Sequence, residues 1–106
     1  MDAQMKKGVL ELCLLQRLSQ GERYGYDLIQ ELRQFFPEVG ESAFYAILRR
    51  LRQGGAVEDF PGAVSGGPPR KYYRITDVGL QRLRRQMDAW LRLREIMDAL
   101  LEGGPG

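Results

Sequence analysis

Apolar and polar positions in the first third of the chain alternate with the period of helices. Between residues 6 and 19 the apolar side chains cover more than one face, which predicts a helix that is packed on two sides. A second helix is predicted from Tyr24 or Gly25 to Phe36, and Pro37 ends it because the residue before a proline avoids helical geometry. Its single apolar stripe has helical spacing and consists of Leu28, Ile29, Leu32, Phe35 and Phe36.

A third helix is predicted over residues 41–53, and its two faces differ in chemistry. Glu41 or Ser42 can cap its first turn, and the Gly54-Gly55 pair stops it. Its apolar stripe follows i, i+3, i+4, i+7 and consists of Phe44, Ile47, Leu48 and Leu51. The opposite face holds Ser42, Ala46, Arg49 and Gln53, with Tyr45 and Arg52 on one flank and Arg50 on the other. Since Arg and Gln side chains hydrogen-bond to base edges, this face suits the major groove of DNA.

The pattern changes to that of strands between residues 56 and 75. A short strand is predicted over residues 56–60, and residues 70–75 are rich in aromatic and β-branched side chains. A Gly/Pro/Ser run over 61–69 separates the two segments, which predicts a hairpin with a long tip. Arg70 and Lys71 place positive charge where this loop meets the second strand. Three helices followed by a hairpin predict a mainly α, winged helix-turn-helix DNA-binding domain with a two-stranded wing, spanning residues 1–75.

One long helix is predicted for the rest of the chain, from Thr76 as N-cap to about Leu101. Steps of three and four residues place one heptad seam along it, formed by Leu80, Leu83, Met87, Trp90, Arg94, Met97 and Leu101. A second apolar stripe, Leu93, Ile96 and Leu100, borders the seam. A single winged domain cannot cover this much apolar surface. We therefore expect residues 76–102 to form the dimerisation helix of a homodimer, followed by a flexible tail at 103–106.

The composition excludes several classes of function. The 106 residues are 43% hydrophobic and 28% charged, as in one globular domain, and include no His and a single Cys. A Cys/His zinc site, a nucleophile paired with His and an intrachain disulfide are therefore impossible within the chain. No set of residues in the sequence is spaced like a catalytic site. We therefore expect no enzyme activity, no metal and no cofactor. Glu11 interrupts the longest apolar run near the start, so neither a signal peptide nor a membrane span is expected, and a cytoplasmic, nucleoid-associated protein is predicted.

The positive charge is concentrated in the middle of the chain. The net charge is −1 over residues 1–40 (5 basic, 6 acidic), +3 over 41–75 (6 basic, 3 acidic) and zero over 76–106 (5 basic, 5 acidic). So small an excess also fits an ordinary solvated face. Its position on the third helix and the hairpin favours DNA as the partner.

Four segments, in this order and spacing, resemble PadR-family transcriptional regulators: Gly8-Val9-Leu10-Glu11-Leu12, Tyr24-Gly25-Tyr26-Asp27-Leu28, Phe44-Tyr45-Ala46-Ile47-Leu48-Arg49-Arg50-Leu51 and Arg70-Lys71-Tyr72-Tyr73-Arg74-Ile75-Thr76. The last of them, followed by Asp77-Val78-Gly79, is the most specific. The single C-terminal helix resembles the small subfamily. The resemblance implies a dimeric winged-helix repressor that binds a palindromic operator and is often released by a small molecule. In two departures, Ala46 stands where the family usually has proline and Phe44 where it usually has an aliphatic residue, which alters the first turn of the third helix.

The resemblance makes the third helix the recognition helix and the hairpin the wing. The candidate DNA-binding residues are Ser42, Tyr45, Arg49, Arg50, Gln53, Arg70, Lys71 and Tyr24. Each has a structural alternative: the arginines can be solvated, Tyr45 can pack against the helix-turn-helix, and Tyr24 can frame the start of the second helix. Strand alternation places Arg70 and Lys71 on opposite faces, so both reach DNA only if Lys71 lies in the loop.

Trp90 and Cys13 each have two interpretations. Trp90 lies mid-seam between Met87 and Met97, where it can pack across the dimer. The sharper hypothesis is an effector site in which Trp90, Met87 and their symmetry mates line a flat slot for planar aromatic molecules. Cys13 lies on a crowded apolar helix and is interpreted as a buried thiol, with a redox sensor as the alternative.

The predicted function is therefore a sequence-specific transcriptional regulator, a homodimeric repressor of a palindromic operator on double-stranded DNA that a small aromatic effector releases. The alternative is a winged-helix module that binds protein and uses the long helix as a coiled-coil adaptor. The small net charge of +2 supports this alternative. The Arg/Tyr face of the third helix argues against it, because protein-binding helices more often expose apolar anchors.

Overall fold

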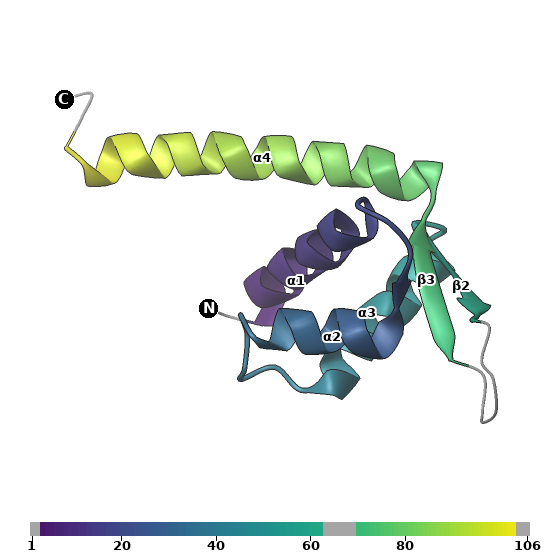
Figure 1. Cartoon of the computed structure of the whole chain (residues 1–106). Coiled ribbons are helices and arrows are strands. Elements are labelled where there is room, and N and C mark those ends of the chain that lie inside the picture. Colours follow the sequence, from purple (N-terminus) through teal and green to yellow (C-terminus); the bar gives the residue numbers. More distant parts are fainter. Residues whose placement is uncertain (1–2, 63–69, 104–106) are drawn as a thin grey trace.

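The computed structural model describes residues 3–62 and 70–103 and has, within them, four helices and a three-stranded antiparallel sheet (Figure 1). The helices are α1 (Ala3–Leu18), α2 (Gly25–Arg33), α3 (Glu41–Gln53) and α4 (Asp77–Leu101). The strands are β1 (Arg23–Tyr24), β2 (Val57–Pro61) and β3 (Lys71–Ile75). Residues 63–69 of the predicted hairpin tip and 104–106 of the predicted tail lie outside the described residues. The mainly α winged-helix architecture is confirmed.

Helices α1, α2 and α3 pack together and enclose the core. The side chains with the least exposure come from all three helices and from β2; they include Leu14, Leu15, Leu28, Ile29, Phe44, Leu48, Leu51 and Val57. The wide apolar arc of α1 is covered on two sides as predicted, since α1 contacts α2 and α3 on one side and α4 on the other (Figure 1). The core thus fixes α3 through its apolar stripe and leaves its polar face free.

The start of α3 differs from the prediction. Its N-cap is Gly40, and neither Glu41 nor Ser42 caps the helix. The carboxylate of Glu41 is used elsewhere: it accepts a 2.7 Å hydrogen bond from Nε2 of Gln30 and lies 3.6 Å from Nη1 of Arg33. Glu41 therefore ties the first turn of α3 to α2, the preceding helix of the helix-turn-helix.

Helix α2 is also shorter than predicted. It ends at Arg33, and the N–H groups of Phe35 and Phe36 both donate to the carbonyl of Leu32 in a turn. Phe36 packs against the core, but Phe35 is 66% exposed and does not belong to the buried stripe. The cause is Pro37, which disfavours helical geometry at the preceding residue and so unwinds the last predicted turn.

The sheet has one strand more than the predicted wing. Strand order is β1-β3-β2, and β1 pairs with β3 through Arg23 opposite Tyr73 and Tyr24 opposite Tyr72. Strands β2 and β3 form the hairpin, with Pro61 opposite Lys71 beside the loop and Val57 opposite Ile75 at the other end. The wing is therefore attached to the residues that begin α2.

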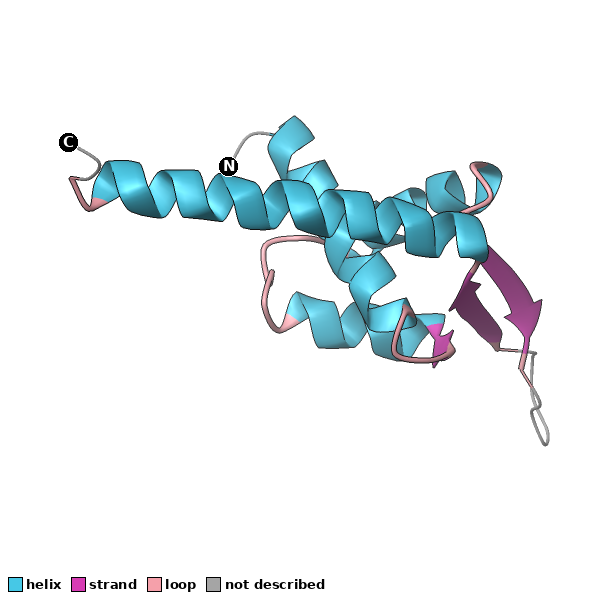
Figure 2. Ribbon diagram, turned by 90° about the horizontal axis from the view of Figure 1, so that it is seen from above, coloured by secondary structure: helices cyan, strands magenta, loops and turns pink. Residues whose placement is uncertain are grey.

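Helix α4 begins as predicted. The Thr76 side chain caps it by accepting a 3.1 Å hydrogen bond from the Gly79 N–H. Leu80 is half-buried and Leu83 is 5% exposed in the core of its own chain. The first half of α4 packs on the winged domain, and its second half projects past the other elements (Figures 1 and 2). None of the described helices is long and apolar enough to span a membrane.

A buried carboxylate joins α1 to α4. Glu11 is 6% exposed, and its Oε1 lies 2.6 Å from Nη2 of Arg82 and accepts a 2.7 Å hydrogen bond from Nε2 of Gln86. In the sequence Glu11 is only an interruption of an apolar run. In the fold it fixes the angle at which α4 leaves the winged domain.

Candidate nucleic-acid interface

The polar face of α3 is open to solvent. Ser42, Arg49, Arg50 and Gln53 are exposed, and Tyr45 is half-buried against the core. The apolar stripe beneath them is buried as predicted. Because the core holds one side of α3, its opposite side presents these polar groups on a rigid rod of 13 residues.

The two neighbouring arginines of α3 line different cavities. Arg49 lines a cavity of about 100 Å³ that opens between α3 and the wing, beside Tyr45 and Lys71. Arg50 lines a larger cavity of about 440 Å³ on the side of α4, beside Arg82. Gln53 also borders this second cavity. Arg49 is therefore the arginine that shares a surface with the wing.

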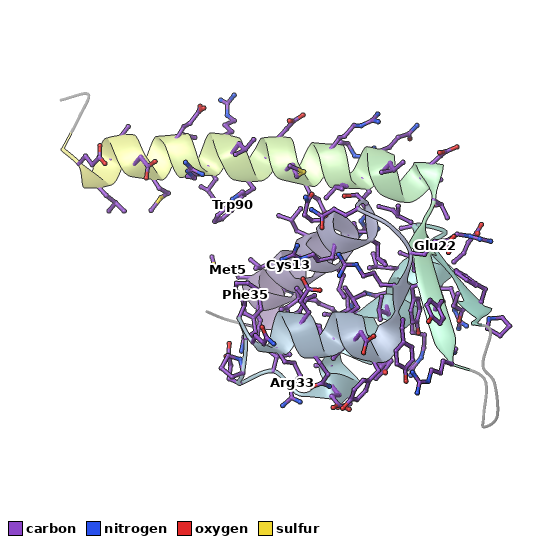
Figure 3. The ribbon with its side chains drawn as sticks, in the orientation of Figure 1. Met5, Cys13, Glu22, Arg33, Phe35 and Trp90 are labelled. Atoms are coloured by element: carbon purple, nitrogen blue, oxygen red, sulfur yellow. The ribbon has the colours of Figure 1, made fainter. Side chains whose placement is uncertain are left out.

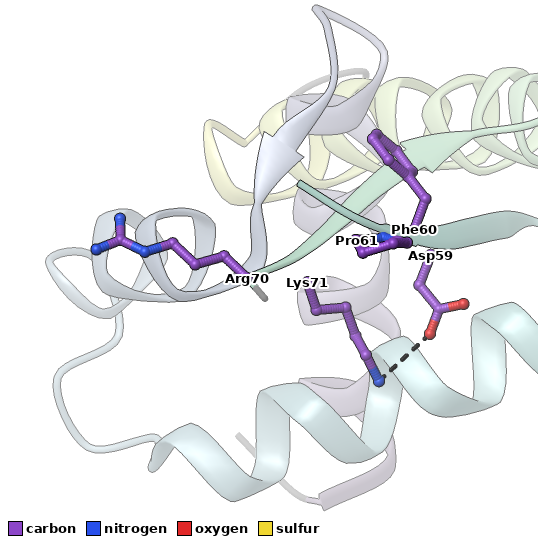
Figure 4. Close-up of a pocket in the computed structure, with 5 residues that line it drawn as sticks. All are labelled: Asp59, Phe60, Pro61, Arg70 and Lys71. Atoms are coloured by element: carbon purple, nitrogen blue, oxygen red, sulfur yellow. Dashed lines mark ion pairs between the residues drawn. The ribbon is translucent and has the colours of Figure 1, made fainter. Parts of the chain in front are cut away.

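The basic pair of the wing is also divided. Lys71 is the first residue of β3 rather than part of the loop, and its exposed side chain turns towards α3, where Nζ lies 3.4 Å from Oδ2 of Asp59. Arg70 points away from Lys71 (Figure 4). Its guanidinium carbon lies 5.0 Å from the centre of the Tyr24 ring. Strand alternation therefore holds, and the two cations present opposite faces of the wing.

The outer face of the sheet carries a row of aromatic rings. Tyr72 lies between Tyr24 and Phe60, with ring centres 5.7 and 5.9 Å away. Arg70 covers the Tyr24 end of the row, and Arg74 lies 4.7 Å from the centre of the Phe60 ring. Such contacts between rings and cations stiffen the sheet. They also support the structural alternative for Tyr24, whose contact with DNA stays a prediction.

An acidic residue lies between α3 and the wing. Oδ2 of Asp59 on β2 lies 3.1 Å from Nη1 of Arg52 on α3 and 3.4 Å from Nζ of Lys71 on β3. Partial burial would raise the pKa of Asp59, but the hydrogen bonds and charges of Lys71 and Arg52 outweigh it and lower the pKa. Asp59 was not among the predicted site residues, although its position two residues after buried Val57 places both side chains on the same face of β2.

Two tyrosine hydroxyls border the same cavity. Burial, followed by the charge of Glu41, raises the pKa of Tyr45. Burial, followed by the charge of Asp59, raises the pKa of Tyr73. Both hydroxyls therefore stay protonated near neutral pH and can donate hydrogen bonds to an acceptor such as a phosphate oxygen.

The described part of the chain shows neither a metal site nor a reactive thiol. It contains no group of three His, Cys, Asp or Glu residues placed to hold a metal ion. Cys13 is half-buried, and this burial raises the pKa of its thiol despite the opposing charge of Arg17. The thiol is therefore protonated near neutral pH, which fits the interpretation as an inert, partly buried group.

The second half of α4 exposes many large apolar side chains. Trp90 is 48% exposed on the side of α4 that faces α1 (Figure 3). Around it lie further exposed large side chains: Met87, Leu91, Leu93, Ile96, Met97, Leu100 and Leu101. Of the predicted seam, Leu83 is buried within its own chain, whereas Met87, Trp90, Arg94, Met97 and Leu101 are exposed.

Known proteins share this architecture over nearly the whole chain. A PadR-like transcriptional regulator from Bacillus cereus superposes with a TM-score of 0.84 at 41% identity, over 95% of this chain and 99% of that one. A PadR family transcriptional regulator from Eggerthella lenta superposes with a TM-score of 0.80 at 32% identity, over 95% of this chain and 88% of that one. An uncharacterized protein of Lysinibacillus sphaericus is 34% identical over 100 residues, which are 92% of each chain.

The family model of PadR-like transcriptional regulators matches residues 14–85. This range contains α2, α3, the described wing and the first part of α4. The related structures named above are transcriptional regulators rather than enzymes. The chain belongs to the PadR-like family of transcriptional regulators.

Proposed function

We propose that the chain is a homodimeric repressor that binds a palindromic operator, with α3 of each subunit in the major groove. The observation that carries this proposal is the exposed polar face of α3 beside a wing that presents Lys71 towards the same side. A helix held by its apolar stripe and bordered by a basic hairpin has the geometry with which winged helix-turn-helix proteins approach DNA.

The candidate contacts divide into two groups by their position. Ser42, Arg49 and Gln53 lie on the exposed centre of α3 and are proposed to contact base edges. Arg50 and Lys71 flank that centre on its two sides and are proposed to bind phosphates. The Tyr45 hydroxyl is proposed to donate a hydrogen bond to a phosphate of the DNA backbone. Arg70, on the outer face of the wing, is proposed to bind a flanking phosphate.

The second half of α4 supports dimerisation. Exposed apolar patches of this kind on a small domain are typical of interaction sites. The exposed apolar side chains extend to Leu101, which is 77% exposed at the end of α4. They lie on the part of α4 that projects from the winged domain. We assign this surface to a second copy of the chain, because the seam follows the heptad spacing of helices that pair with each other.

A dimer of this kind predicts a spacing between the two DNA half-sites and a dependence of binding on salt. The two copies of α3 must enter successive major grooves, about 34–36 Å apart. Phosphate contacts from both subunits make binding weaken with salt, with a log–log slope of about −0.9 for each phosphate neutralised.

Selection from random duplexes with the purified protein, followed by footprinting, tests the proposal. We expect two half-sites related by a dyad. Arg49→Ala should weaken operator binding by about 1–3 kcal/mol and relax specificity at one symmetric pair of positions. Arg84→Ala removes an equal charge from an exposed position of α4, outside the surface of α3 and the wing, and should change affinity little. Failure to enrich any duplex would favour the protein-binding alternative.

Release by an effector is proposed at Trp90 and Met87, which are exposed on neighbouring turns of α4. Their copies in the second subunit would complete a flat apolar slot. Titration with planar aromatic compounds such as acridine should quench Trp90 fluorescence saturably and weaken operator binding. A linear, unsaturable quench without any change in DNA affinity would contradict the effector site and leave the DNA-binding proposal standing.

A further inference from the structure

Asp59 joins the recognition helix to the wing within one chain. Its Oδ2 contacts a cation on each of two elements, Arg52 of α3 at 3.1 Å and Lys71 of β3 at 3.4 Å (Figure 4 shows the contact with Lys71). The Asp59 side chain is 22% exposed. We call these three residues the Asp59 clamp.

The position of this carboxylate is unexpected for a surface that binds DNA. The negative charge of Asp59 repels phosphates. Asp59 also forms ion pairs with two cations, Arg52 and Lys71, that lie on the proposed DNA-facing side. Its neighbour Glu58 has the same charge but lies on the opposite face of β2, where its Oε2 lies 2.9 Å from Nε of Arg74. The chain thus places one acidic residue on the outer face of the wing and one against the recognition helix.

Arg49 differs from the clamped cations. It lines the same cavity as Arg52 and Lys71, but among the described residues it forms no ion pair. Arg49 can therefore form new hydrogen bonds with a base without first giving up a partner. Arg52 and Lys71 can bind a phosphate only by sharing Asp59 with it or by leaving Asp59.

We propose that Asp59 is a specificity-determining residue, which holds the wing against α3 and restrains Arg52 and Lys71 from binding phosphates on DNA that lacks the operator sequence. This inference rests on the proposed DNA-binding function and adds a residue to it. Binding to random DNA depends almost entirely on phosphate contacts, so a carboxylate beside two cations weakens it directly.

The same carboxylate weakens binding to the operator less than binding to random DNA. The clamp fixes the distance between α3 and the wing before DNA arrives, so less side-chain and loop freedom is lost when both elements bind together. The Arg52 guanidinium has five N–H groups and the Lys71 ammonium has three, which leaves donors for a phosphate while the contacts with Asp59 persist. The clamp therefore lowers affinity for random DNA more than affinity for the operator.

The test compares Asp59→Asn with Glu58→Gln in the full chain. Dissociation constants are measured at one salt concentration for the duplex selected by the wild-type protein and for a random duplex of equal length. We expect Asp59→Asn to tighten random-DNA binding at least threefold and to lower the operator-to-random affinity ratio about tenfold. Glu58→Gln removes the same charge one residue away and should leave the ratio within twofold of wild type. Asp59→Glu keeps the charge and should restore most of the ratio.

Equal ratios for Asp59→Asn and Glu58→Gln would overturn the inference, because Asp59 would then act only as a surface charge. If Asp59→Asn fails to fold by circular dichroism, Arg52→Gln breaks the clamp from α3, and an unchanged ratio in that variant overturns the inference equally. Failure of the wild-type protein to bind any duplex would instead refute the proposed function. The two failures are therefore distinguishable.

Discussion

Gly79, in the first turn of α4, has no room for a side chain. A Cβ atom at this position would overlap the carbonyl oxygen of Ala56 and lie 2.6 Å from Cγ1 of Ile75. The Ala56 carbonyl cannot move freely, because it accepts a 3.0 Å hydrogen bond from the Thr76 N–H. We therefore expect Gly79→Ala to destabilise the chain, although alanine is the better helix former.

The size of the effect follows from three contributions. Overpacking of a filled site costs about 1–3 kcal/mol. Displacing the Ala56 carbonyl weakens its hydrogen bond with Thr76, at a further cost of about 1 kcal/mol. Replacing glycine by alanine within a helix returns about 1 kcal/mol. The free energy of unfolding should therefore fall by about 2 kcal/mol, which lowers the melting temperature by roughly 8–16 °C for a domain of this size.

Urea unfolding followed by circular dichroism measures this change. All variants are compared at one protein concentration, because self-association makes apparent stability depend on concentration. Gly8→Ala is the matched control: Gly8 lies within α1, and an added Cβ there meets no atom within 4 Å, so a gain of about 0.5–1 kcal/mol is expected. A Gly79→Ala variant that unfolds at or above the wild-type urea midpoint would refute the packing argument.

Three other residues give separate tests. Thr76→Ala removes the side-chain oxygen that caps α4 and should cost about 1 kcal/mol in urea unfolding, whereas Thr76→Ser should stay near wild type. Glu11→Gln removes the charge that Arg82 pairs with and should cost about 1–2 kcal/mol, since Arg82 keeps access to water; a wild-type midpoint would count against the link between α1 and α4. Burial raises the pKa of the Cys13 thiol and so leaves less thiolate at alkaline pH. Iodoacetamide at about pH 8.5 should therefore alkylate folded Cys13 more slowly than the urea-unfolded chain; equal rates would contradict the assigned burial.

The two-sided character of α3 was predictable because the information is local. Phe44 and Leu51 lie on one side of a helix and Arg49 and Gln53 on the other by spacing alone, and the fold confirms this division. The long helix and its Thr76 cap were predictable for the same reason. What sequence spacing predicts well is which side of a helix or strand a residue occupies.

Contacts between distant segments were not predictable. Strand β1 has only two residues, too few to show alternation, and it exists because Arg23 and Tyr24 pair with β3 far along the chain. The hydrogen bond from Gln86 to buried Glu11 joins residues 75 positions apart. Asp59 likewise meets Arg52 only after the wing has folded against α3. In each case the contact forms only when separate helices and strands come together in the fold.

Sedimentation equilibrium of the protein alone and with its selected duplex tests the central proposal most directly, because the proposed function needs two copies of α3 held at one spacing. We predict a free particle of twice 12.1 kDa at micromolar concentration and two chains on each duplex. A single 12.1 kDa chain that also binds the duplex one to one would contradict the proposed dimeric repressor.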